Sequence, residues 1–302
     1  MALALTDYLT HEELAALNRR SDARAWWALS VNWGLIAGAF ALAVAWPNPA
    51  TIVVAVLVLG GRQLGLGILV HDCAHHALFV RRRTNERFGQ WLAGWPMAIS
   101  LPAYRTYHLA HHRHAGTPHD PDLGFVAAYP VPMASLRRKL LRDATGRTGF
   151  RDQRLMLGRM VQQRNWAMLG PWLAFHAVLF GVLAAAGAWW AYALWWVALL
   201  CVYPVVMRLR QIGEHGVVAD RADPDPRRNT ATTLVSWWER LLIAPNHVNW
   251  HLEHHAAGGV PPYRLARMHA LLRARGFHDG HDAVSHGYRD VVRRATRVRV
   301  NA

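Results

Sequence analysis

The chain has 302 residues, 53% of them hydrophobic, and a formal net charge of +15 at pH 7. Its apolar residues form long charge-free runs with the charged residues between them, which is typical of a membrane protein and not of a soluble globular domain. The two cysteines, Cys73 and Cys201, are too few for a disulfide framework. The basic residues flank the apolar runs and match no nucleic-acid-binding motif, so we expect a membrane as partner and no nucleic acid.

Two apolar runs follow the N-terminal segment. Residues 26–46 contain no charged residue and have tryptophans at both ends, as interfacial aromatic belts do. The turn Pro-Asn-Pro at 47–49 separates them from a second run, 50–70, whose one charge is Arg62. Each run is long enough to cross the hydrocarbon core of a bilayer. For Arg62 we expect a side chain that faces the bundle with a carboxylate or carbonyl partner; a position beside a substrate channel is the alternative.

A third run, 166–207, contains no Asp, Glu, Lys or Arg and is about twice as long as one crossing needs. Ala-Gly-Ala at 186–188 lies near its middle, so we predict two helices, 166–186 and 188–207, joined by a tight turn. The apolar segment 89–101 is too short and too interrupted by Pro and Gly to span a membrane. There we predict a half-buried or interfacial helix.

The predicted fold is an all-α integral membrane protein with one domain, 1–302. It has four transmembrane helices in two hairpins, interfacial helices, and a helical cap formed by 71–165 and 208–302. The turns at 47–49 and 186–188 carry no basic residue, whereas the cap segments are rich in arginine. By the positive-inside rule, the cap and both termini are expected on the cytoplasmic side, with the inner cell membrane as the location.

Twelve of the 19 histidines lie in three short windows, all within the predicted cap. The windows are HDCAHH at 71–76, HLAHH at 108–112 with His114 and His119 after it, and HVNWHLEHH at 247–255. Spacings of three and four residues bring histidines of one window onto one helical face. Imidazole binds iron, copper and zinc, and eight or more convergent imidazoles exceed the needs of one tetrahedral zinc. We therefore expect two metal ions. The zinc-protease motif HExxH is absent.

The boxes HDCAHH, HLAHH and HLEHH resemble the three histidine boxes of the membrane fatty acid desaturase superfamily, which also holds hydroxylases and ketolases. The resemblance extends from about Gly61 to His269. It implies a cytoplasmic di-iron centre with two Fe ions, molecular oxygen as co-substrate, two electrons from an external donor, and an apolar lipid or acyl substrate that enters along a tunnel. The combination of three boxes is specific to the superfamily, whereas any single box is not.

Residue by residue, the resemblance implies nine iron ligands. They are His71, His75, His108, His111, His112, His215, His251, His254 and His255. In the first box the spacing favours His75 over His76, and His215 corresponds to a histidine that the family often places before the third box. Residues beside the boxes are expected to accept hydrogen bonds from the imidazoles or to support them otherwise. They are His76, Asp72, His247, Glu214, Glu253 and Asn249. Asp120 and Asp122 lie beside the second box, but Pro118 and Pro121 favour loop positions for them. Scattered histidines, among them His269 and His278, are expected to lie outside the centre.

Three functions remain open. The first is a fatty acyl desaturase that introduces a C=C bond into an acyl chain. The second is a hydroxylase or ketolase on the same scaffold, acting on an acyl chain or another lipid such as a carotenoid. The third is a non-enzymatic membrane protein that binds metal, although charge-free spans argue against a conduction path. The sequence contains no His-Pro-Gly-Gly of a cytochrome b5 domain and no Cys-rich pattern, so a separate donor of ferredoxin, rubredoxin or cytochrome b5 type is expected.

Overall fold

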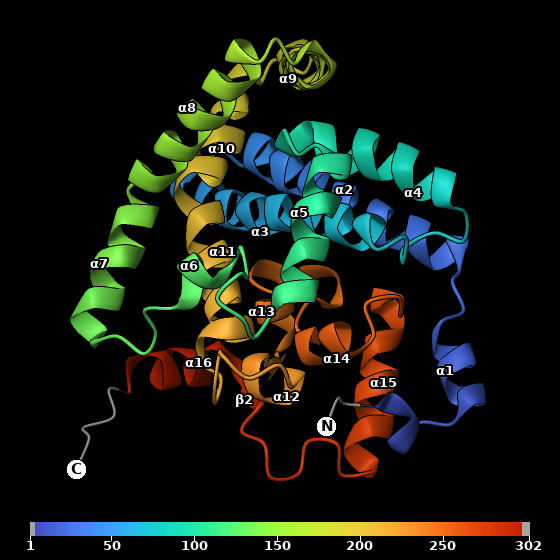
Figure 1. Ribbon diagram of the computed structural model, residues 1–302. Coiled ribbons are helices and arrows are strands. Elements are labelled where there is room, and N and C mark those ends of the chain that lie inside the picture. Colours follow the sequence, from blue (N-terminus) through green and yellow to red (C-terminus); the bar gives the residue numbers. More distant parts are fainter. Residues whose placement is uncertain (1–3, 298–302) are drawn as a thin grey trace.

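The computed structural model describes residues 4–297 and is mostly helical (Figure 1). Four of the described helices are long and apolar enough to cross a membrane, as the hydrophobic runs predict. They are α2 (Asp22–Ala45), α3 (Pro49–Ala74), α9 (Trp166–Ala185) and the composite helix Trp189–Gly216. Their arrangement as two membrane hairpins below a cytoplasmic cap stays a prediction.

The second and fourth spans are longer than predicted. α3 continues past residue 70 to Ala74, and the composite helix continues past residue 207 to Gly216. These extensions carry His71 and His215, both of them buried. A polar residue can continue a buried helix when its side chain finds a partner, so two of the predicted ligands belong to the candidate membrane helices themselves.

The composite helix is interrupted by two π turns. It consists of η4 (Trp189–Ala191), α10 (Tyr192–Val197), the π turn η5 (Ala198–Val202), α11 (Tyr203–Gln211) and the π turn η6 (Ile212–Gly216). Pro204 is the second residue after η5. It has no N–H, and its ring clashes with the carbonyl of the preceding turn, which explains the first interruption. A π turn rotates the side chains that follow it, and such turns are frequent at functional sites.

Arg62 lies in the middle of α3 and is only 4% exposed. Its guanidinium donates hydrogen bonds to the main-chain carbonyl oxygens of Leu241 and Arg240 in α13 (Trp237–Leu242). This confirms the prediction of a bundle-facing side chain with a carbonyl partner. The neighbouring residue has to be a glycine, because a Cβ on Gly61 would lie 2.8 Å from Leu242 Cα and 2.9 Å from the Leu241 carbonyl oxygen.

Seven short elements lie between α3 and α9. They are α4 (Arg82–Gly89), η2 (Gln90–Gly94), η3 (Trp95–Met97), α5 (Leu101–His114), α6 (Leu123–Val126), α7 (Met133–Ala144) and α8 (Arg147–Gln162). The half-buried helix predicted over 89–101 is present in irregular form, because α4 is followed by the π turn η2 and the 3-10 turn η3. Ala98 has a left-handed backbone with φ 55° and ends this path, and Ser100 then caps α5.

The remaining elements surround the histidine windows. They are η1 (Leu5–Asp7), α1 (His11–Leu17), α12 (Pro226–Asn229), β1 (Thr232–Leu234), α13, η7 (Pro245–His247), α14 (His251–Ala256), α15 (Pro262–Ala274), β2 (Val284–His286) and α16 (Gly287–Thr296). The strands β1 and β2 pair in parallel, which departs from the all-α prediction. Strands of three residues are too short for an alternating pattern to reveal them in the sequence.

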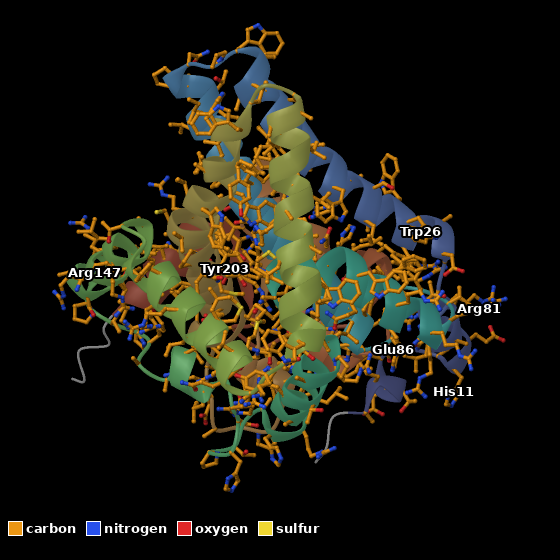
Figure 2. The ribbon with its side chains drawn as sticks, turned by 90° about the horizontal axis from the view of Figure 1, so that it is seen from above. His11, Trp26, Arg81, Glu86, Arg147 and Tyr203 are labelled. Carbon is orange, nitrogen blue, oxygen red and sulfur yellow. The ribbon has the colours of Figure 1, made fainter. Side chains whose placement is uncertain are left out.

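The apolar and polar parts of the molecule lie at different ends. In Figure 2 the connection between α2 and α3 forms the tip at the top of the picture, and the labelled residues Arg81, Glu86 and Arg147 lie in the broad half away from it. In Figure 1, α12 to α16 and α1 gather on the side opposite α9. The histidine windows therefore lie where helix ends from many parts of the chain meet.

The contact between α3 and α13 predicts a specific sensitivity at Gly61. We expect Gly61→Ala to lower the stability of the detergent-solubilised protein by about 1–3 kcal/mol, because the new methyl group overlaps main-chain atoms. Gly38→Ala on α2 is the matched control, since its Cβ would meet nothing within 4 Å. Thermal unfolding of the two variants measures the difference, and equal melting temperatures would show that α13 does not pack on α3 in this way.

Candidate metal centre

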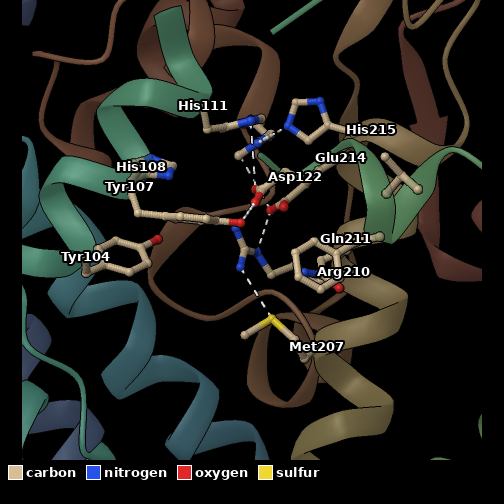
Figure 3. A pocket seen from close by; sticks show the side chains of 13 residues that line it. Tyr104, Tyr107, His108, His111, Asp122, Met207, Arg210, Gln211, Glu214 and His215 are labelled. Carbon is tan, nitrogen blue, oxygen red and sulfur yellow. Dashed lines mark hydrogen bonds and ion pairs between the residues drawn. The ribbon is translucent and has the colours of Figure 1, made fainter. Parts of the chain in front are cut away.

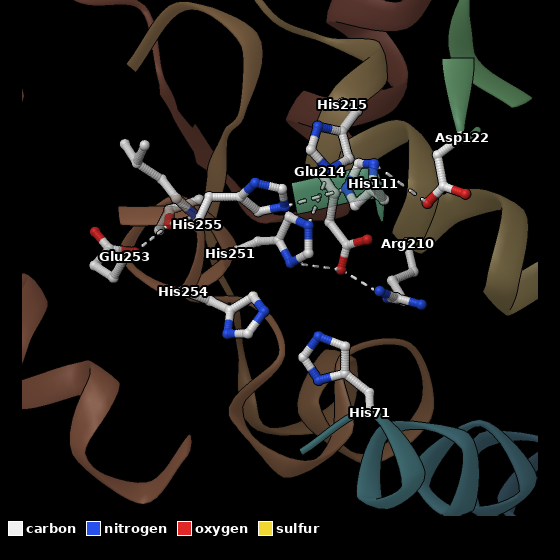
Figure 4. Close-up of polar contacts among 12 residues, drawn as sticks. His71, His111, Asp122, Arg210, Glu214, His215, His251, Glu253, His254 and His255 are labelled. Carbon is white, nitrogen blue, oxygen red and sulfur yellow. Dashed lines mark hydrogen bonds and ion pairs between the residues drawn. The ribbon is translucent and has the colours of Figure 1, made fainter. Parts of the chain in front are cut away.

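Nine imidazoles from four separate parts of the chain gather in two groups. The first group is His71, His75, His108, His112 and His254, and the second is His111, His215, His251 and His255. Within each group the ligand atoms lie within 4.8 Å of one another. These are the nine histidines that the resemblance implies as ligands, and the structure brings all of them together. Figure 4 shows His71, His254 and the four histidines of the second group.

The end of α3 decides which histidines of the first box reach the centre. His71 belongs to the last turn of the helix, and His75 is its C-cap residue. His76 then adopts a left-handed backbone with φ 53°, so the chain reverses direction. Its ring lies beside Arg82 and Glu86 instead, with its Nε2 3.2 Å from an Arg82 nitrogen. His76 is therefore outside both groups.

Helix α5 and helix α14 each contribute to both groups. On α5, His108 and His112 are four residues apart and face the first group, while His111 faces the second. On α14, His251 and His255 face the second group, and His254 faces the first. Residues three and four apart on a helix are neighbours on its surface, and each helix thus spans the boundary between the groups. The π turn η6 brings His215 into the second group.

Three of the histidines have an acceptor behind their Nδ1 atom. The Nδ1 of His71 donates to Asp72 at 2.9 Å, and that of His111 to Asp120 at 2.7 Å. The Nδ1 of His215 donates to the main-chain carbonyl of Asn229 at 3.1 Å. Because these oxygens accept, the proton of each ring is on Nδ1, and Nε2 is left with a lone pair that points into its group.

The Nε2 atoms then face one another at short distances. His215 Nε2 lies 3.0 Å from His251 Nε2, and His111 Nε2 lies 3.3 Å from His255 Nε2. Two lone pairs at such a distance repel unless a proton or a cation lies between them. Two nitrogens bound to one metal ion at roughly 2.1 Å each are separated by about this much. The donor set and its tautomers therefore fit a metal ion in each group.

Four histidines outside the candidate membrane helices are held in the uncharged form that a metal requires. Burial lowers the pKa of His112 to about 2 and that of His75 to about 4, and it lowers the pKa of His254 and His255 well below the usual range. The neighbouring imidazoles act in the same direction. At neutral pH these rings bind no proton that a metal would have to displace.

The residues predicted to support the ligands lie at different distances from the ligand rings. Asp72 and Asp120 contact ligands directly, as described above. Glu214 pairs with Arg210 at 2.6 Å and lies 3.5 Å from His251 Nδ1. Asp122 is more distant, 3.8 Å from His111 Nδ1.

Two further predicted supports lie elsewhere. Asn249 donates to the Thr233 carbonyl and so holds the chain beside β1. His247 has a buried Nδ1 without a partner and belongs to neither group of imidazoles.

Glu253 faces away from the nine imidazoles and forms a third buried group. Its Oε1 accepts from His269 Nδ1 at 2.7 Å and from His278 Nε2 at 3.0 Å, and its Oε2 accepts from Thr232. These hydrogen bonds lower the pKa of Glu253 to about 2, although burial acts in the opposite direction and is the larger single effect. Sequence spacing did not indicate His269 or His278, because they lie on or after α15, far from the boxes.

A cavity of about 410 Å³ borders both groups of histidines, and we call it the histidine cavity (Figure 3). His108 of the first group and three members of the second group line it. Its other walls are aromatic and aliphatic side chains, with a polar side formed by Asp122, Gln211 and the Arg210–Glu214 pair. It provides space for a small organic molecule beside the imidazoles.

The hydrogen bonds of Glu253 predict a supporting role for it. We expect Glu253→Ala to lower metal affinity by about 10–100-fold, because α14 loses its anchor to α15 and two buried histidines lose their acceptor. Glu253→Gln, which keeps an acceptor oxygen, should lose less, and Glu12→Ala on exposed α1 is the control. Metal content after dialysis against a chelator measures the effect. Wild-type metal retention by Glu253→Ala would contradict it.

Comparison with known proteins identifies the family. The fatty acid desaturase family matches residues 47–287. A dihydrorhizobitoxine desaturase of Bradyrhizobium elkanii is 26% identical over 238 residues, which cover 72% of this chain and 66% of that protein. Two β-carotene ketolases of Paracoccus strains are also similar. One is 27% identical over 249 residues, 80% of this chain and 86% of the ketolase. The other is 45% identical over 75 residues, 23% of this chain and 31% of that ketolase.

The match spans about two thirds of the desaturase relative and most of one ketolase. Both names describe oxidoreductases of the membrane fatty acid desaturase superfamily. The family match covers well over half of the sequence, including all three histidine boxes. The chain therefore belongs to the fatty acid desaturase family, as its histidine boxes predict.

Proposed function

We propose that this protein is an oxygen-dependent desaturase that introduces a C=C bond into the acyl chain of a lipid at a di-iron centre. The observation that supports the proposal most directly is the joint position of nine imidazoles and the histidine cavity. Two groups of uncharged nitrogen ligands suit two iron ions, and the cavity borders both groups. The family match provides the reaction class, oxidation of a substrate by a desaturase-type oxidoreductase.

In this proposal the nine histidines hold two irons, which supply activation of molecular oxygen for attack on an unactivated C–H bond. The chain positions the substrate and keeps water away from the reacting carbon. Tyr104, Phe125 and Met207 offer apolar surface for the substrate in the histidine cavity. Asp72 and Asp120 fix the orientation of two ligand rings from behind.

A second candidate is oxygenation of a lipid or carotenoid on the same scaffold. The observation that favours it is the similarity to two β-carotene ketolases, one of them over 80% of this chain. The polar side of the histidine cavity, with Arg210, Glu214 and Gln211, would suit a product that carries oxygen. Product mass separates the two reactions, because a desaturase removes two hydrogens and a ketolase or hydroxylase adds one oxygen.

We also propose that electrons come from a separate donor of ferredoxin, rubredoxin or cytochrome b5 type. The formal net charge of +15 would favour an acidic donor. The protein would lie in the inner cell membrane, with its termini and metal centre on the cytoplasmic side. The basic residues between and after the apolar spans support that orientation.

The ligand assignment predicts a loss of both metal and turnover. His108→Ala and His255→Ala should each lower bound iron and abolish substrate oxidation, because a group without one of its imidazoles cannot hold its ion in the same geometry. His119→Ala is the control, since this exposed histidine follows the second box and belongs to neither group. Iron is measured on purified protein, and products by mass spectrometry of extracted lipids. Full turnover by His255→Ala would overturn the assignment.

The proposed orientation predicts which residues a membrane-impermeant thiol reagent reaches. In a protein with Cys73→Ala and Cys201→Ala, we expect Asn48→Cys and Gly187→Cys to label in intact cells, because the two short turns face outward. Arg83→Cys and His119→Cys should label only after permeabilisation. Labelling of position 119 from outside with position 83 protected would place the first two boxes on opposite sides, which contradicts a shared metal centre.

A further inference from the structure

A second cavity of about 390 Å³ lies between α2, α3, α13, η7 and α15, and we call it the α2 cavity. Its walls include Arg24, Arg62, Arg240, Asp72, His247 and Trp27. None of the nine imidazoles lines it, so it is separate from the histidine cavity. Of its lining residues, Asp72 alone has a role in the function proposed above, and three of the others are arginines.

The charges around the α2 cavity favour an anion. Three arginines, Arg24, Arg62 and Arg240, face one carboxylate, Asp72. Among these arginines, Arg24 and Arg240 have no carboxylate within ion-pair distance, and both are exposed. A phosphate or carboxylate group entering this space would meet three guanidinium groups, which are the preferred partners of such anions.

Buried polar atoms in this cavity lack partners within the protein. The Nε of Arg62 and the Oδ2 of Asp72 are buried without a hydrogen bond, and these residues are only 4% and 5% exposed. The Nδ1 of His247 is also buried without a hydrogen bond. Unsatisfied buried groups are destabilising, and a ligand at this cavity would give all three a partner. Arg62 needs an acceptor there, whereas Asp72 needs a donor.

The backbone at this cavity is also held in a costly conformation. Asn246 and His247 are consecutive non-glycine residues with left-handed backbones, at φ 54° and φ 67°. Such strain is concentrated at ligand-binding positions, where the surrounding structure maintains it. The side chain of Asn246 donates a hydrogen bond to the Gly65 carbonyl of α3 at 2.8 Å, which holds Asn246 in place. The strained pair thereby places His247 at the cavity wall.

The outer edge of the cavity is apolar and belongs to a candidate membrane helix. Trp27, Ala28 and Val31 of α2 line it, and Trp27 is 72% exposed. Tryptophan at the end of a membrane helix lies at the level of the lipid headgroups. The occupant therefore combines an anionic head between the arginines with an apolar part along α2, which describes a membrane lipid.

We propose that the α2 cavity binds the head of an anionic phospholipid that carries hydroxyl groups beside its phosphate. The phosphate contacts Arg24, Arg62 and Arg240, and a head hydroxyl donates to the free oxygen of Asp72. The other oxygen of Asp72 accepts from His71 Nδ1 at 2.9 Å, so the bound lipid lies one side chain from the five-histidine group. Lipid binding itself does not depend on the proposed enzymatic activity.

The test measures lipid binding to the purified, delipidated full chain in detergent by native mass spectrometry. The probes are phosphatidylglycerol, phosphatidylcholine and soluble glycerol 1-phosphate. We expect phosphatidylglycerol to bind at least about tenfold more tightly than phosphatidylcholine, and Arg24→Gln with Arg240→Gln to remove that preference. The matched control is Arg137→Gln with Arg138→Gln, two exposed arginines of α7 with the same change in charge. Melting temperature and metal content, measured on all variants, show that each is folded.

Equal affinity for phosphatidylglycerol and phosphatidylcholine would overturn the proposal. An equal loss of the preference for phosphatidylglycerol in both double variants would also overturn it, because diffuse surface charge would then explain the binding. Displacement of phosphatidylglycerol by glycerol 1-phosphate at equal concentration would show that the head alone is recognised, and a soluble phosphate ester would then replace the lipid as ligand. Because none of these measurements uses turnover, failure here leaves the proposed desaturase reaction untouched. Loss of turnover in the His255 variant likewise leaves this lipid site untouched.

Discussion

The structure depends on the close approach of nine imidazoles, six of them buried and three partly buried. Two ring nitrogens 3.0 Å apart, as in His215 and His251, repel one another unless a proton or a cation lies between them, and the repulsion is strong because little water is present to screen it. A bound cation turns the same geometry into an attraction. Metal binding and the mutual positions of α3, α5, α14 and η6 are therefore thermodynamically linked, because these elements all contribute to the two groups.

The groups behind the imidazoles extend this linkage into the rest of the molecule. Asp120, in the loop after α5, and the carbonyl of Asn229, at the end of α12, each fix one ring. Glu253 connects the third box to α15 through His269 and His278. Buried carboxylates are tolerated only when their acceptor sites are filled, so these contacts restrict how the loops can be arranged. A loop that differs in sequence at these points would leave a ring unsupported.

Two cavities approach the centre from different sides. The histidine cavity touches the imidazoles themselves, whereas the α2 cavity reaches them only through Asp72 and His71. In the two proposals made above, substrate and lipid therefore occupy separate spaces.

The sequence by itself determined the four apolar spans, the three boxes and the family, because hydropathy and short motif spacing are local properties of a chain. It also determined which nine histidines meet, through the resemblance. Only the tertiary structure decided the division into groups of five and four and the partners of Glu253, His269 and His278. It also decided the π turns and the two short strands. These features depend on contacts between residues far apart, such as His215 with His251, and no local pattern specifies which distant partner a side chain will meet.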